Sequence, residues 1–125
     1  LYINYTANKD KKAHEQALDQ IVVSKNNLTI TESEALIIAN NMYSAMERMG
    51  TDDNSVIDKL VNKTPDDIKL IIKKFGVRKY NLFGAPLWNW MGGTDLDLMG
   101  WLRKEFSGKN LEKLKQIFAT AGITL

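Results

Sequence analysis

The sequence predicts an all-α fold, a compact bundle of about five to six short helices. Apolar residues recur at helical spacing along most of the chain, and residues that cap helices precede these runs. No alternating run rich in Val or Ile is long enough for a sheet. Of the 125 residues, 44% are hydrophobic and 26% are charged, so we expect one packed core in one globular unit.

The first thirty residues are expected to form an arm followed by a short helix. Residues Leu1 to Thr6 alternate apolar and polar side chains, which predicts a short extended arm. From Asp10 to about Val23 the spacing predicts an amphipathic helix, whose apolar face consists of Ala13, Ala17, Leu18 and Ile21. We therefore divide the chain into residues 1–30 and a helical domain of residues 31–125.

The clearest helix of the sequence is predicted to begin at Glu32. Thr31 and Glu34 form a capping box, in which each side chain accepts a hydrogen bond from the backbone amide of the other residue. Gly50 can adopt the left-handed conformation that ends a helix. Between these residues runs an apolar stripe at helical spacing: Ala35, Ile38, Ala39, Met42, Ala45, Met46 and Met49.

Two helices are predicted after this glycine. Thr51 or Asp52 can cap a short helix that ends near Lys63, and its inward face is Val56, Ile57, Leu60 and Val61. Thr64 then provides an N-cap and Pro65 suits the first helical position. The buried face of this second helix is expected to be Ile68, Leu70, Ile71, Ile72 and Phe75, with Gly76 as its end.

A long loop rich in aromatic residues is predicted from residue 77 to about residue 94, because glycines and a proline are scattered among its rings. Thr94 is expected to cap the next helix, with Asp95 and Asp97 in the first turn. Its residues available for burial are Leu96, Leu98, Met99, Trp101 and Leu102. Ser107 and Gly108 break this helix, and a last helix is predicted from about Asn110 to Thr120.

One candidate binding surface emerges where basic residues are interleaved with aromatic ones. Such a surface can bind an anionic membrane, a nucleic acid backbone or a glycan, because charges attract and rings stack or anchor. The candidate residues are Lys73, Lys74, Arg78, Lys79, Tyr80, Trp88 and Trp90. In the alternative interpretation, the two adjacent lysines solvate a helix end while Tyr80, Phe83, Trp88 and Trp90 fold back over the core.

Catalytic chemistry finds little support in the sequence. The chain has no cysteine and one histidine, His14, which excludes Cys/His pairs and two-histidine zinc motifs. We expect His14 on a polar helix face. Pairs of aspartates occur only where first turns of helices are predicted, at Asp52/Asp53, Asp66/Asp67 and Asp95/Asp97, so stabilisation of helix ends accounts for them. We expect no catalytic residue and no enzyme.

Two segments together resemble the start and end of an annexin repeat, an all-helical unit. The first reads Met46-Glu47-Arg48-Met49-Gly50-Thr51-Asp52, and the second contains Glu105-Phe106-Ser107-Gly108. The resemblance covers about Thr31 to Phe118 as a single divergent copy, whereas annexins usually carry four repeats. It implies an annexin-like arrangement of helices in residues 31–125.

The resemblance also implies a calcium site at these two segments. In the family, carbonyl groups of the first turn and a carboxylate at the position of Glu105 hold the ion. Here Arg48 replaces the first glycine of the turn, and the separation between Gly50 and Glu105 is longer than in the family. A bulky cation at that position opposes the approach of six to eight oxygen ligands. We therefore expect no cofactor, with calcium at this turn as the alternative, and no site for another metal.

Together these observations predict a non-enzymatic interaction or structural module with an annexin-like fold. The alternatives are a calcium-dependent peripheral membrane-binding protein and an accessory domain of an enzyme that acts on glycan or phosphodiester. The net charge of +2 supplies no overall field that strongly favours nucleic acid or an anionic membrane. As partner we expect a protein or a membrane surface and not nucleic acid. Residue 1 is Leu, which fits removal of an upstream signal or anchor; such removal would indicate an extracytoplasmic or membrane-associated protein.

Overall fold

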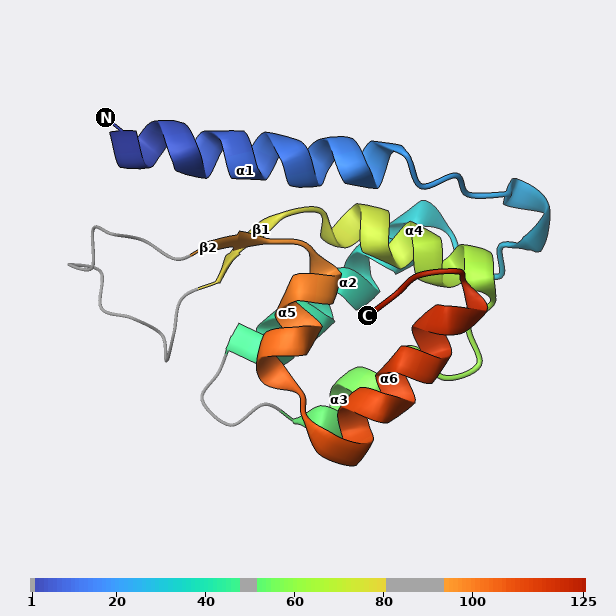
Figure 1. Cartoon of the computed structure of the whole chain (residues 1–125). Helices are drawn as coiled ribbons and strands as arrows, with labels where there is room; N and C mark the ends of the chain where they lie inside the picture. Colours follow the sequence, from blue (N-terminus) through green and yellow to red (C-terminus); the bar gives the residue numbers. More distant parts are fainter. Residues whose placement is uncertain (1, 48–51, 81–93) are drawn as a thin grey trace.

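The computed structural model describes residues 2–47, 52–80 and 94–125, with side chains from residue 11 onward. It confirms a mainly helical bundle, and within these ranges it adds a two-stranded sheet (Figure 1). The elements are α1 (Tyr2–Asp19), the 3-10 helix η1 (Lys25–Asn27), α2 (Glu32–Glu47), α3 (Asp53–Asp58), α4 (Pro65–Phe75), β1 (Arg78–Tyr80), β2 (Thr94–Leu96), α5 (Leu98–Glu105) and α6 (Gly108–Thr120).

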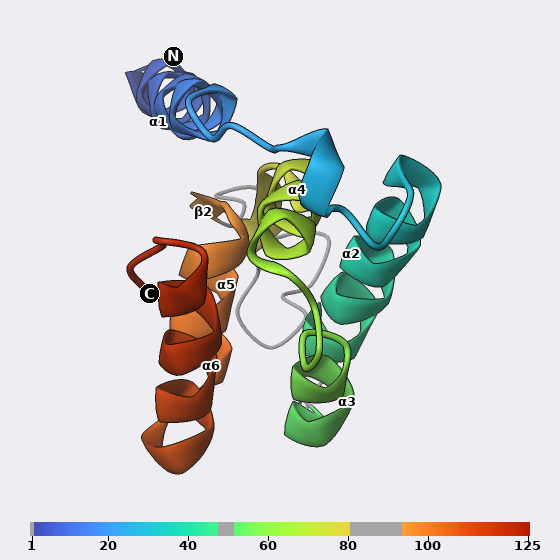
Figure 2. The same cartoon turned by 90° about the vertical axis from the view of Figure 1, so that its right-hand side faces the viewer.

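Helix α4 forms the centre of the bundle. In Figure 2 it lies between α2 and α3 on one side and α5 and α6 on the other, with α1 outermost. Its predicted buried face is confirmed, because Ile68, Leu70, Ile71, Ile72 and Phe75 are all buried. The core continues into α2 through Ala35, Ala39, Met42 and Met46, and into the C-terminal helices through Leu98, Trp101, Leu102, Leu114 and Phe118.

Most of the predicted helix ends are confirmed by local hydrogen bonds. Thr31 and Glu34 exchange the two bonds of a capping box, and Thr64 and Asp67 form a second one. Helix α4 ends at Gly76, whose φ of 62° is a left-handed value that favours glycine. Asp52 caps α3 by accepting from the Ser55 amide, as predicted.

Helix α3 is shorter than predicted. It ends at Asp58 and not near Lys63. Val61, which was expected to face inward, is 42% exposed, whereas Val56 and Leu60 are buried. Val61 continues the helical spacing of apolar residues into the following turn, so the sequence predicts one helical turn too many.

The prediction of an extended N-terminal arm is wrong. Helix α1 begins at Tyr2 and ends at Asp19, so the arm is helical and the helix stops before Val23. A helix satisfies its backbone donors and acceptors internally, whereas a lone extended arm needs a neighbouring strand. The predicted apolar face is wrong in part, since Leu18 is buried and Ile21 half-buried but Ala13 and Ala17 are exposed.

The helix predicted from Thr94 begins later, and a strand takes its first residues. Strands β1 and β2 pair antiparallel, with Arg78 opposite Leu96 and Lys79 opposite Asp95. Helix α5 starts at Leu98, and Asp97 is its N-cap. Strands of three residues are too short to show a two-residue period, so the alternation that predicts strands could not reveal them.

Two aspartates fasten the segment before α2 to the start of α4. The fully buried Asp67 carboxylate accepts from the Thr29 amide at 2.8 Å, from the Thr29 hydroxyl and from the Thr64 amide at 3.0 Å. Asp66 accepts from the Ser24 amide at 2.9 Å. Both residues were predicted only as part of a helix first turn, and the structure adds this link between distant segments.

Burial of Asp67 by itself would raise the pKa of its carboxyl group. The hydrogen bonds from Thr29 and Thr64 outweigh that effect and lower this pKa below its ordinary value. Asp67 is therefore held as a charged acceptor inside the protein.

Candidate functional site

Arg78, the first residue of β1, lies among the rings between α2 and α4. Its guanidinium carbon is 5.0 Å from the ring centre of Tyr43 and 4.7 Å from that of Phe75. The side chain also donates to Asn40 Oδ1 at 2.8 Å and to the Phe75 carbonyl at 2.9 Å. Partial burial lowers the pKa of Arg78, although a guanidinium stays protonated in proteins. Arg78 thus joins three elements of the fold.

The aromatic side chains beside Arg78 pack edge to face around Trp101. The Trp101 ring is buried and lies 5.3 Å from Tyr43, 6.3 Å from Phe75 and 4.7 Å from Tyr80, measured between ring centres. Its indole nitrogen donates to the Arg78 carbonyl at 3.1 Å. The Tyr80 hydroxyl donates to Glu105 at 3.1 Å, and burial, helped by this carboxylate, raises the pKa of Tyr80. Tyr80 therefore covers the core.

The three lysines of the predicted surface point to different neighbours. Lys73 donates to the Ile21 carbonyl after α1 at 2.8 Å. Lys74 forms an ion pair with Glu32 of α2 at 3.2 Å. Lys79 is exposed and stands opposite Asp95 in the strand register. Trp88 and Trp90, and Phe83 of the alternative interpretation, lie outside the described residues.

We expect Arg78→Lys to lower the free energy of unfolding by about 1–2 kcal/mol. The lysine keeps the charge but cannot make two directed hydrogen bonds from a planar group that also stacks on two rings. Urea unfolding followed by circular dichroism measures this loss. The control is Lys79→Gln on the exposed face, expected within about 0.5 kcal/mol of wild type. Equal losses of stability for the two variants would contradict a stabilising role for the Arg78 side chain.

The acidic residue that the resemblance assigns to calcium has a role in packing. Glu105 accepts the Tyr80 hydroxyl bond at the end of α5. Residues 48–51 of the first turn, with Arg48 and Gly50, lie outside the described residues, so the expectation about calcium stays a prediction. Across the part of the chain that the structure describes, no group of three His, Cys, Asp or Glu side chains is placed to hold a metal ion.

His14 lies closer to the rest of the fold than its predicted position on a polar helix face implies. Its Nδ1 atom is 3.8 Å from Asp97 Oδ2, at the junction of β2 and α5. Asp97 at the same time caps α5 by accepting from the Gly100 amide at 2.9 Å. This pair helps to hold α1 against the two-stranded sheet of β1 and β2.

A shallow pocket of about 300 Å³ opens between α1 and the end of α4. Its lining consists of Lys11, Glu15, Leu18, Asp19, Lys73, Gly76 and Val77. Two cations and two carboxylates share this space, so the pocket has no net charge that would select an anionic or a cationic ligand.

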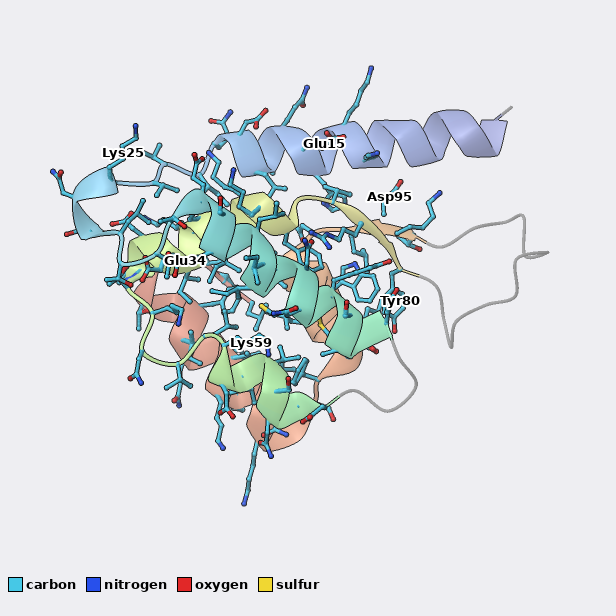
Figure 3. The ribbon with its side chains drawn as sticks, turned by 180° about the vertical axis from the view of Figure 1, so that it is seen from behind. Glu15, Lys25, Glu34, Lys59, Tyr80 and Asp95 are labelled. Carbon is cyan, nitrogen blue, oxygen red and sulfur yellow. The ribbon has the colours of Figure 1, made fainter. Side chains whose placement is uncertain are left out.

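One exposed surface was missed by the sequence reasoning. The outer face of α2 consists of Ser33, Glu34, Leu36, Ile37, Asn40 and Asn41, all exposed. Ile37 is 58% exposed and Leu36 43%, and no charged residue occurs between Glu34 and Glu47. Figure 3 shows α2 on the near side of the molecule, between α1 and α3. The absence of charged residues between Glu34 and Glu47 is readable in the sequence. Leu36 and Ile37, however, fall beside the predicted core stripe, so the helical spacing does not single them out.

Within the described ranges, no helix is both long enough and apolar enough to cross a bilayer. Comparisons of the chain with protein-family models, curated proteins and solved structures return no match.

Proposed function

We propose that the protein is a non-enzymatic interaction module that binds protein through the outer face of α2. The observation that carries the proposal is the exposure of Ile37 and Leu36 in the part of α2 between Glu34 and Glu47, which contains no charged residue. Exposed helix faces are ordinarily rich in charged residues, whereas the centres of protein interfaces are depleted of them.

The chemistry of this face suits a protein partner. Covering Ile37 and Leu36 removes apolar surface from water, worth about 25 cal/mol for each Å². Asn41 offers hydrogen bonds without the cost of desolvating a charge, whereas the Asn40 side-chain oxygen already accepts from Arg78. The opposite face of α2 is buried through Ala35, Ala39, Met42 and Met46, so the helix presents its outer side chains from a fixed backbone.

The annexin-like arrangement of the helices is a second part of the proposal. It is supported by the positions of two helix junctions, since α3 begins after Asp52 and α6 begins after Ser107, where the resemblance places turns. The Glu105 carboxylate accepts a hydrogen bond from the Tyr80 hydroxyl. We therefore propose an annexin-like arrangement of helices without the calcium site of that family.

The proposed function is tested by photo-crosslinking in cells that make the protein. A photoreactive amino acid at position 37 is expected to yield discrete covalent protein adducts. An excess of the unlabelled wild-type chain should suppress these adducts, and the Ile37→Lys chain should not. Position 22 is the matched control, because Val22 is 77% exposed but belongs to another surface. Equal adduct patterns from positions 22 and 37 would refute the proposed contact face.

A further inference from the structure

We infer that the occupant of the α2 face is a second copy of this chain, bound in antiparallel orientation about Ile37. This inference rests on the proposed function and adds the identity and geometry of the partner. A two-fold contact brings the same patch of both subunits together, so the patch must be complementary to itself.

The apolar and neutral residues of the face match under such a two-fold axis. When two antiparallel copies of α2 cross at Ile37, a residue that precedes Ile37 in one copy stands level with the residue that follows Ile37 by the same number of positions in the other copy. Ile37 then meets its own copy beside Leu36, which makes an apolar centre. Ser33 stands level with Asn41 of the other copy, and a hydroxyl group and an amide can exchange hydrogen bonds.

The charges along α2 favour the antiparallel over the parallel orientation. Glu32 and Glu34 stand at the beginning of the helix, where Lys74 offsets one of them. Beyond Ile37, the Arg78 guanidinium donates a hydrogen bond to Asn40 Oδ1 at 2.8 Å. Figure 3 shows this polarity, since Glu34 lies toward one end of α2 and Tyr80, in the same strand as Arg78, lies toward the other. Antiparallel pairing brings the acidic end of each copy level with Arg78 of the other.

The remaining acidic residue of α2 does not oppose this pairing. Glu47 lies ten residues after Ile37, level with a position that precedes the first residue of α2. No acidic residue of one α2 therefore stands level with an acidic residue of the other. In a parallel pair, by contrast, Glu34 would stand level with its own copy, and like charges so placed are destabilising.

Single cysteines test the geometry directly, because the natural chain has none. At a two-fold axis the same residue from both copies comes within disulfide distance. Ile37→Cys is expected to form a disulfide-linked dimer under mild oxidation, and the exposed control Val22→Cys is expected to stay monomeric. A mixture of Ser33→Cys and Asn41→Cys chains should link to each other, and neither should link to itself. Self-linking of Ser33→Cys and of Asn41→Cys without mixed linking would indicate parallel pairing and overturn the inference.

Sedimentation equilibrium of the unmodified chain gives an independent measurement. The wild-type chain is expected to approach twice its mass of 14.2 kDa as concentration rises, and Ile37→Lys to remain at the single mass. Circular dichroism checks that Ile37→Lys is folded, as expected for an exposed position. A monomeric wild-type chain without Ile37→Cys dimers would overturn the inference. Photo-adducts from position 37 to a different protein would then still support the proposed function, whereas no adducts at all would remove both.

Discussion

Trp101→Ala is expected to lower the free energy of unfolding by about 3–5 kcal/mol. Trp101 is the largest of the fully buried side chains in the described part of the chain, and it joins α5 to α2, α4 and β1. Its removal deletes three ring contacts and leaves a cavity beneath Tyr80. It also leaves the Arg78 carbonyl without the indole donor.

Urea unfolding followed by far-ultraviolet circular dichroism measures this loss, since the chain has three tryptophans and their combined fluorescence would report several sites. The matched control is Trp101→Phe, which keeps a ring at the site but removes the N–H donor. We expect this variant to lose roughly half as much stability or less. A loss below about 1 kcal/mol for Trp101→Ala, as for an average surface site, would contradict the central role of the ring cluster.

Asp67→Ala is expected to lower the free energy of unfolding by about 2–4 kcal/mol. The substitution leaves the amides of Thr29 and Thr64 and the Thr29 hydroxyl without their acceptor. Amide hydrogen exchange should then accelerate at Thr29, which this carboxylate holds against α4. Asp66→Ala is the matched control, because it removes one hydrogen bond from Ser24 at the neighbouring position. Equal exchange at Thr29 in both variants would show that Asp67 does not anchor this residue.

The same carboxylate makes stability depend on pH in the acid range. The pKa of Asp67 is lower in the folded state than in an unfolded chain, so the folded state holds its proton less tightly. The stabilisation is therefore complete above the unfolded pKa of about 4 and is lost as pH falls through the folded pKa. Wild type should lose stability in this window more steeply than Asp67→Asn, which cannot titrate. Parallel pH profiles would be inconsistent with the lowered pKa.

Local chemistry explains which parts of the fold were predictable. The capping residues Thr31 and Thr64 act on amides three residues away, so the beginnings of α2 and α4 follow from the sequence alone. Gly76 ends α4 for a similarly local reason, its positive φ. The hairpin of β1 and β2 was missed because its hydrogen bonds join segments separated by a long stretch of chain.

The predicted surface of basic and aromatic residues shows the same limit of reasoning from sequence alone. Sequence reasoning grouped Lys73, Arg78 and Tyr80 because they are close along the chain. In the fold they contact the segment after α1, the rings between α2 and α4, and Glu105 of α5. Closeness in sequence did not give these three side chains a common neighbour, since side-chain direction depends on the neighbouring elements.

The sequence by itself determined the helical class, the capped ends of α2, α3 and α4, and the buried face of α4. Only the tertiary structure decided that Asp67 binds Thr29, 38 positions away, and that Arg78 stacks on Tyr43 and Phe75. The helical stripe already placed Ala35 inward, and the structure adds that the neighbouring Leu36 and Ile37 stay uncovered. The physical reason is range: caps and periodicity act within one or two helical turns, whereas burial and partner choice arise when distant segments pack together.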